Sequence, residues 1–243
     1  MPLDGKVQTL NRRFANHSAT SVMEHALTNL GNIALVSSFG AESIVLLHMA
    51  AVIDRRVTVL FIDTEMLFTQ TLVYQQEVAE RLHLENVRVI RASRAAVFET
   101  DNENLLHLHD PDACCALRKT APLQNALRGY EGWVTGRKRY QGGQRASLDF
   151  FEIERPVDAM PRIKVNPLAH WDTGDLQEYI AQNRLPRHPM VTQGYPSIGC
   201  APCTSRVGQG EDPRAGRWRD TDKEECGIHF EDGVLVRTPK VTA

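Results

Sequence analysis

The chain has 243 residues, of which 42% are hydrophobic and 24% charged, so it is long enough to bury one sizeable core. A net charge of -2 gives no general basic field, which argues against nucleic acid as a partner, and no apolar run approaches the length of a membrane span. The N-terminus lacks the apolar core of a signal peptide, and five cysteines, an odd number, favour a reducing cytoplasmic location over a disulfide framework.

The first part of the chain predicts alternating helices and strands. Apolar residues at helical spacing predict a helical region within 12–30, which Gly31 is placed to end. Beyond it, short apolar runs alternate with helical patterns, which is typical of strands joined by crossover helices. The predicted strands cover residues 33–36, 57–62, 87–90, 133–136 and 163–165. We therefore expect an α/β fold, with a mostly parallel sheet covered by helices on both faces.

The middle of the chain carries weaker signals. Residues 100–113 read as a connector into the next helix. Pro122 is expected to divide the helical pattern that follows into one segment near 112–121 and another near 122–128, because proline interrupts a helix.

Three regions describe the expected organisation of the chain. An N-terminal helical region at 1–30 precedes an α/β nucleotide-binding domain at 31–185. From Pro186 onward prolines, glycines and charges follow no clear period, so we expect 186–243 to be an irregular segment that wraps the same globular unit.

Polar loops follow three of the predicted strands. Parallel sheets bind ligands at the carboxyl ends of their strands, where residues 37–40 and Asp63-Thr64 are expected to lie. A small-residue loop before a helix presents backbone N–H groups to an anion, although an ordinary turn has the same composition. The basic loop 137–145 and the later arginines Arg206, Arg214, Arg217 and Arg219 suit phosphate or sulfate, with solvated surface charge as the alternative.

Four cysteines form two close pairs, Cys114-Cys115 and Cys200-Ala201-Pro202-Cys203. Four thiolates suit an iron–sulfur cluster or zinc, and adjacent ligands are unusual for zinc, which favours the cluster over zinc or unrelated buried thiols. Lys119 lies four residues after Cys115, hence on the same face of a helix, so its ammonium could face the metal centre or simply the solvent.

Cys226 is the cysteine without a nearby cysteine partner. Its neighbours are polar, and His229 follows three residues later, so an exposed thiol beside a cation is favoured over a small buried hydrophobe. We therefore predict a nucleophile at Cys226.

Together these motifs resemble the assimilatory adenylyl-sulfate (APS) reductases of bacteria, the iron–sulfur type within the PAPS/APS reductase family. The resemblance runs from about residue 33 to 230. The segments that carry it are Ser38-Phe39-Gly40-Ala41-Glu42, Asp63-Thr64, Cys114-Cys115, Lys119, Gly199-Cys200-Ala201-Pro202-Cys203-Thr204, Gly210-Glu211-Asp212, Arg214-Ala215-Gly216-Arg217-Trp218 and Glu225-Cys226-Gly227-Ile228-His229.

The resemblance implies a Rossmann-like adenine-nucleotide α-hydrolase fold and a thioredoxin-dependent reduction of APS to sulfite and AMP, in sulfate assimilation and cysteine biosynthesis. It implies that Cys226 forms an S-sulfocysteine intermediate and that thioredoxin is an external reductant. It further implies a [4Fe–4S] cluster on Cys114, Cys115, Cys200 and Cys203. The candidate substrate-binding residues are Ser37, Ser38, Gly40, Asp63, Thr64, Lys119, Gly136, Arg139, Arg145, Arg214, Arg217 and His229.

Other functions compete with this one. PAPS-reducing relatives typically lack the cysteine pairs. PP-loop ATP pyrophosphatases, such as iron–sulfur tRNA-thiolating enzymes, usually carry Ser-Gly-Gly-x-Asp-Ser where this chain has Ser-Ser-Phe-Gly-Ala-Glu-Ser at 37–43. A metal-stabilised redox-sensing protein would not need a reactive Cys226.

Two loops depart from the family pattern. Many members read Asp-Thr-Gly where this chain has Asp63-Thr64-Glu65, and Gly-x-Arg-Arg-x-Gln-Ser where it has Gly-Arg-Lys-Arg-Tyr-Gln-Gly at 136–142. We also expect the C-terminal tail to move, because Cys226 must meet both a buried substrate and a protein reductant. The sequence is compatible with a homo-oligomer.

Overall fold

The structure is a computed structural model that describes residues 2–219, with Gln144 described by its backbone alone. The predicted residues Cys226 and His229, and the tail for which we expect motion, lie outside the described residues. Among the residues described, no helix is both long enough and apolar enough to pass through a membrane.

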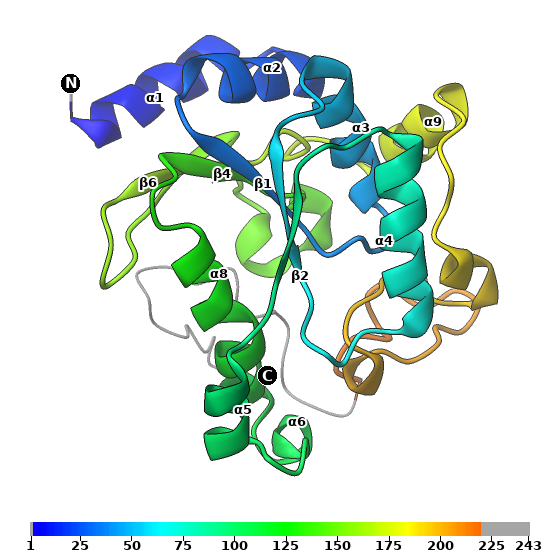
Figure 1. The fold of residues 1–243 in the computed structure, drawn as a ribbon. Coiled ribbons are helices and arrows are strands. Elements are labelled where there is room, and N and C mark those ends of the chain that lie inside the picture. Colours follow the sequence, from blue (N-terminus) through cyan, green and yellow to red (C-terminus); the bar gives the residue numbers. More distant parts are fainter. Residues whose placement is uncertain (1, 220–243) are drawn as a thin grey trace, which may run out of the picture.

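One six-stranded sheet forms the centre of the fold (Figure 1). Its strands, in spatial order, are β3 (Val87–Ile90), β2 (Thr58–Ile62), β1 (Ile33–Ser37), β4 (Gly132–Val134), β6 (Arg162–Val165) and β5 (Phe151–Glu154). All neighbours pair in parallel except β5, which runs antiparallel to β6. The prediction of a mostly parallel α/β sheet is confirmed. Because the strand order reverses between β1 and β4, the loops that follow these two strands diverge there and leave room for a ligand.

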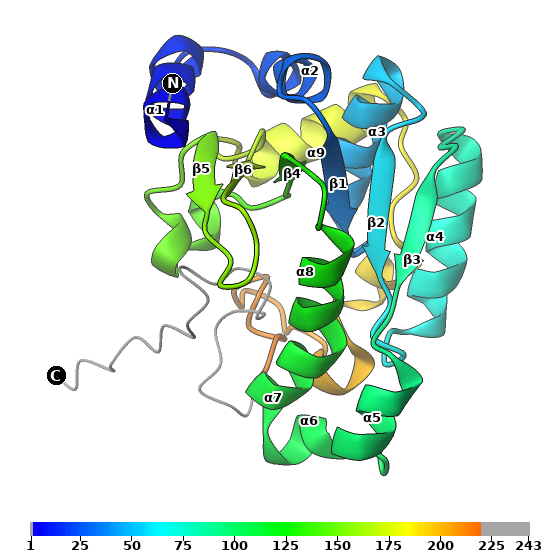
Figure 2. The same ribbon diagram turned by 60° about the vertical axis from the view of Figure 1, so that its left-hand side comes forward.

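Helices cover both faces of the sheet (Figure 2). They are α1 (Leu3–Phe14), α2 (Ala19–Asn29), α3 (Ser43–Ile53), α4 (Thr69–Arg81), α5 (Arg94–Thr100), α6 (Leu106–His109), α7 (Pro111–Cys115), α8 (Ala121–Ala126) and α9 (Thr173–Gln182). The main hydrophobic core lies on the side of α2, α3, α4 and α9, and a smaller cluster joins α8 to the opposite face. Successive side chains of a strand point to opposite faces, so Leu35 enters the first core and Ala34 the second.

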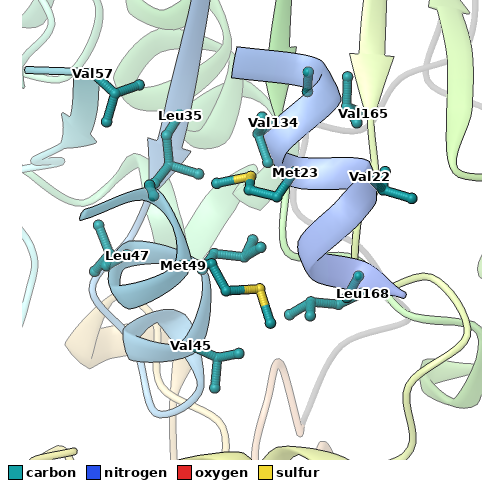
Figure 3. Close-up of a cluster of buried hydrophobic side chains, with 14 of the residues drawn as sticks. Val22, Met23, Leu35, Val45, Leu47, Met49, Val57, Val134, Val165 and Leu168 are labelled. Carbon is teal, nitrogen blue, oxygen red and sulfur yellow. The ribbon is translucent and has the colours of Figure 1, made fainter. Parts of the chain in front are cut away.

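The main core is built from aliphatic side chains of strands and helices far apart in the sequence (Figure 3). Val22 and Met23 of α2 meet Val134 of β4 and Val165 of β6, with Met49 of α3 below them. All five are at most 1% exposed, so this layer fixes the sheet against its helices and holds the strand ends in place.

Several predicted elements differ from the structure. The region 12–30 is split, because α1 begins near the N-terminus and the Ser18 hydroxyl accepts the Ser21 N–H and starts α2 separately. The connector 100–113 contains α6 and the start of α7. A new helical segment, α8, does start beside Pro122 as expected, but without a break in the chain's helical course: the π-helical turn η1 (Ala116–Thr120) joins α7 to α8, with the Ala121 N–H bonded to Ala116 O.

Between residues 186 and 219 the chain forms two 3-10 turns, η4 (Pro189–Gln193) and η5 (Ala201–Cys203), and isolated bridges. A bridge between Leu67 and Cys200 attaches this segment to the loop after β2. The domain boundaries proposed from the sequence stay a prediction.

Candidate active site

A pocket of about 240 Å³ opens at the carboxyl ends of β1, β2 and β4, on the switch point of the sheet. Most of the substrate-binding residues predicted from the sequence line it: Ser37, Ser38, Gly40, Thr64, Lys119, Gly136, Arg145, Arg214 and Arg217. Cys200 lines it too. The fold thus brings the small-residue loop, several cationic side chains and one of the paired cysteines into a single site.

The loop after β1 is held in shape by its own serines. The Ser37 hydroxyl accepts the Phe39 N–H at 3.1 Å, and the Ser43 hydroxyl accepts the Gly40 N–H at 3.0 Å. Phe39 adopts a left-handed φ of 49° and buries its ring edge-on against Phe61, with the centroids 5.1 Å apart. A non-glycine residue there is strained, and the buried ring contact compensates for that strain.

The two predicted residues after β2, Asp63 and Thr64, face different surroundings. Thr64 lines the pocket, and its Oγ1 lies 3.3 Å from Cys200 Sγ. Asp63 is not among the lining residues: its carboxylate binds the Arg91 guanidinium at 2.8 Å and accepts the Glu65 N–H at 2.9 Å. Glu65, where many relatives have glycine, has a φ of 60°, a left-handed conformation that glycine adopts at lower cost.

The turn η1 carries two buried cationic side chains, Arg118 and Lys119, which point toward different parts of the protein. Lys119 lines the pocket. Arg118 instead binds Asp101 through Nε and Nη2, at 3.1 and 2.8 Å, and donates from Nη1 to the Thr64 carbonyl at 3.2 Å. Arg118 therefore ties the cysteine-bearing helix to the loop after β2.

Cys114, from the first cysteine pair, lies near the second pair, of which Cys200 lines the pocket. Cys114, Cys115 and Cys200 are buried and Cys203 is half-buried. Burial, and the nearby thiols of Cys200 and Cys203, raise the pKa of Cys114 to about 11, so members of the two pairs lie close enough to interact. Among the described residues, no three His, Cys, Asp or Glu side chains converge on one point as a single metal ion requires. An iron–sulfur cluster makes a different demand, because its thiolates bind separate irons; four cysteines on two buried, adjoining segments fit that donor set.

The basic loop after β4 points its side chains in two directions. Arg137, Lys138, Tyr140, Gln141 and Arg145 line the pocket. Arg139 does not: its Nε donates to the Leu148 carbonyl at 2.7 Å, outside the pocket lining. The loop was predicted as a basic site, but which of its side chains face the pocket depends on backbone angles that the sequence pattern does not reveal.

The pocket face of this loop carries a buried ion pair. Lys138 Nζ lies 2.5 Å from Glu42 Oε2, and the Tyr140 hydroxyl donates to Glu42 Oε1 at 2.8 Å. Burial lowers the pKa of Lys138, whereas the Glu42 carboxylate opposes that change. Burial and the same carboxylate raise the pKa of Tyr140, so its phenol stays protonated and donates. None of the three was singled out as a site residue from the sequence, although each lies within a motif noted there.

The segment with Arg214 and Arg217 also lines the pocket. The Arg217 guanidinium lies over the Trp218 ring, 4.4 Å from its centroid. A Cβ on Gly199 would lie 2.3 Å from Arg217 Nη2, so only glycine allows the guanidinium to pass so close to the chain before Cys200. This places a bidentate cation next to the cysteine turn.

Trp133 of β4 forms part of the pocket wall and is fixed from behind by charged residues. Its indole N–H donates to Glu154 at 2.7 Å, and Lys164 Nζ lies 5.0 Å from its ring centroid. Burial lowers the pKa of Lys164 to about 7. Strand β5, absent from the sequence prediction, supplies Glu154 and therefore supports the wall.

Comparison with known proteins bears on this site. A family profile described as the phosphoadenosine phosphosulfate reductase domain matches residues 32–206. The chain belongs to this family. It is 43% identical over 234 residues to a protein of a Chelativorans species named adenosine 5'-phosphosulfate reductase, covering 94% of each chain.

Solved structures agree with the fold of this family. A phosphoadenylyl-sulfate (PAPS) reductase from Candida auris, crystallised as a phosphate complex, matches with a TM-score of 0.68 and 26% identity, over 83% of this chain and 96% of that one. Yeast FAD synthetase in complex with FAD matches with a TM-score of 0.51 and 16% identity, over 77% and 66% of the two chains, which is a likeness of fold alone. The expected adenine-nucleotide α-hydrolase type of fold is confirmed.

Proposed function

We propose that this chain reduces adenylyl sulfate (APS) to sulfite and AMP in sulfate assimilation. The observation that carries the proposal is the pocket itself, where a strand–helix loop, cationic side chains and Cys200 meet at the switch point of the sheet. The similarity to a relative named adenosine 5'-phosphosulfate reductase supports the same substrate. The two cysteine pairs favour APS over PAPS, because PAPS-reducing relatives typically lack them.

The substrate is an adenosine mononucleotide extended by a sulfate, and the pocket supplies donors for such an anion. Backbone N–H groups of the loop after β1 stand at the start of α3, where a helix favours negative charge. Lys119, Arg214 and Arg217 add cationic donors from other segments. One arginine guanidinium can bind two oxygens of a phosphate or sulfate group at once. Arg214 and Arg217 would therefore orient the phosphosulfate as well as attract it.

The reaction needs a nucleophile and a reductant. The Cys226 thiolate attacks the sulfur of APS; a sulfur–sulfur bond forms, the bond from sulfur to the bridging oxygen breaks, and AMP leaves with the electron pair. A thioredoxin thiolate then attacks Cys226 Sγ and displaces sulfite, and its second thiol resolves the mixed disulfide, which leaves thioredoxin oxidised. His229, as a cation, would favour ionised Cys226.

Cys114, Cys115, Cys200 and Cys203 would hold a [4Fe–4S] cluster. When bound, the cluster would cross-link the two cysteine segments and add its charge to the field around the pocket. The protein's own contribution is to bury Cys114, Cys115 and Cys200 and to place Lys119 in the adjoining pocket. Such a centre and a free reactive thiol suit the cytoplasm, where thiols stay reduced.

The deciding experiment is incubation of the anaerobic protein with labelled APS in the absence of reductant. We expect one sulfite-sized adduct per chain, located on Cys226 by peptide mass analysis, and its release as sulfite when reduced thioredoxin is added. Cys226→Ser should form no adduct and lose roughly 10³-fold or more of the turnover, because no other nucleophile replaces a thiolate.

Two controls complete this test. The iron content of Cys226→Ser should equal that of the native protein, which separates loss of the nucleophile from loss of the cluster. An adduct elsewhere, or normal turnover of the variant, would contradict the mechanism. A parallel incubation with PAPS measures how strictly the enzyme selects APS.

A further inference from the structure

Lys138 links two loops that are far apart in the sequence. Its Nζ lies 2.5 Å from Glu42 Oε2, and the two residues are separated by 96 positions in the chain. The Lys138 side chain is 3% exposed, whereas that of Glu42 is 31% exposed. The Tyr140 hydroxyl binds the other carboxylate oxygen, so both oxygens of Glu42 are held by the basic loop.

A second contact joins Lys138 to a predicted substrate-binding residue. Gln141 Oε1 accepts the Lys138 backbone N–H at 3.2 Å and also binds the Arg145 guanidinium. Gln141 therefore links the Lys138 backbone to Arg145, which lines the pocket.

The basic loop has little regular backbone structure, so these side-chain contacts largely determine where it lies. It consists of two short 3-10 turns, η2 (Arg139–Gln141) and η3 (Gly143–Arg145), joined at Gly142 with a φ of 72°. Glycine reaches this angle without strain. Because 3-10 turns of this length contribute little stability, the ion pair between Lys138 and Glu42 is an important tether.

Charge gives the tether a second role. Glu42 lies in the lining of a pocket whose other charged residues are mainly cationic, and a carboxylate there would repel an anionic nucleotide. Lys138 places a positive charge directly on that carboxylate. The pair can thus fix the loop without opposing the ligand.

We propose that Lys138 is a positioning residue: by neutralising Glu42 it anchors the basic loop to the start of α3, which keeps Arg145 in the pocket and sets the affinity for the anionic nucleotide. The inference rests on the proposed function, because it concerns the site for APS and AMP.

The test compares native protein with Lys138→Met, Lys138→Arg and the double variant Lys138→Met/Glu42→Gln. Lys138→Met should raise KM for APS and Kd for AMP roughly tenfold while kcat changes about twofold at most, since the half-buried Glu42 carboxylate then keeps its negative charge in the pocket without the ammonium beside it. Lys138→Arg keeps the ion pair and should stay within about threefold of the native KM. The double variant removes the unpaired carboxylate and should bind AMP more tightly than Lys138→Met.

A merely structural role for Lys138 predicts the opposite order, with the double variant as weak as the single variant or weaker, and that result would overturn the inference. So would an unchanged KM and Kd in Lys138→Met. If Lys138→Met fails to fold, Tyr140→Phe gives the same test at the half-exposed end of the cluster, where loss of one hydrogen bond to Glu42 should raise both constants about threefold.

AMP binding by calorimetry separates this inference from the proposed function. If native protein does not reduce APS, the proposed function fails, and the order of AMP affinities among the variants still decides the role of Lys138.

Discussion

His188 has 0% exposure and holds the start of turn η4 from within the protein. Its Nδ1 accepts the Met190 N–H at 3.2 Å, so the ring proton sits on Nε2, which lies 3.1 Å from the Thr71 hydroxyl. Protonation of Nδ1 would place a hydrogen against the Met190 N–H and remove the acceptor of that bond. Burial accordingly lowers the pKa of His188 to about 4.

This lowered pKa predicts acid sensitivity. Between pH 6.5 and about 4 the unfolded chain carries the proton and the native protein does not, so stability is present above pH 6.5 and is lost as pH falls. The loss should approach about 1.4 kcal/mol per pH unit within that window. Urea unfolding at pH 7 and pH 5 measures it. His188→Gln should flatten the difference, whereas His109→Gln, at an exposed position, should not; equal pH dependence in all three proteins would refute the assignment.

At the scale of elements, α7, η1 and α8 act as one bent helix that serves both the cysteines and the pocket. A π-helical turn inserts extra residues into a helix and is frequent at functional sites. Here it lets Arg118 and Lys119, neighbours in sequence, both be buried toward different partners. Arg118 reaches Asp101 and the Thr64 carbonyl, so the helix, the loop before it and the loop after β2 are joined at one guanidinium.

Asp101→Ala tests this junction. The substitution removes the buried carboxylate that lies 2.8 Å from the Arg118 guanidinium, itself 2% exposed, and should lower the free energy of unfolding by roughly 3–5 kcal/mol. Asp101→Asn retains hydrogen-bonding atoms and should cost less. Urea denaturation of the native protein and the two variants gives the comparison. A loss below about 1 kcal/mol in the alanine variant would show that Arg118 is held by its other contacts.

At the scale of the whole molecule, the pocket brings together segments that are far apart in the sequence. It is lined by the loops after β1, β2 and β4, by η1 and by the segment from 196 to 218. A ligand bound there contacts several of these segments at once, so it should stabilise the native state against unfolding of any of them.

AMP should therefore raise global stability. At one hundred times its dissociation constant the gain should be about 2.7 kcal/mol, visible as a higher Tm. Arg217→Met should reduce the gain at the same AMP concentration, while adenosine, which lacks the phosphate, should shift both proteins alike. An equal AMP shift in the native protein and in Arg217→Met would remove Arg217 from the binding site.

The sequence by itself determined the fold class and the strand-end loops that line the pocket. The spacing of apolar residues along the chain predicts the strands at 33–36 and 87–90 and their alternation with helices. This spacing depends only on residues that are close in the sequence. In a parallel sheet the loops at the carboxyl ends of the strands share one edge, and for this reason the sequence predicts Ser37, Thr64 and Gly136 at the site.

Only the tertiary structure decided which individual side chains face that edge. Asp63 turns to Arg91 and Arg139 to the Leu148 carbonyl, while Lys138 and Glu42 meet inside the pocket. The antiparallel strand β5, which supports Trp133, was likewise decided by pairing with β6. The physical reason is the same throughout: a side chain in a loop points where the backbone angles send it, and those angles are set by contacts with residues distant in the sequence.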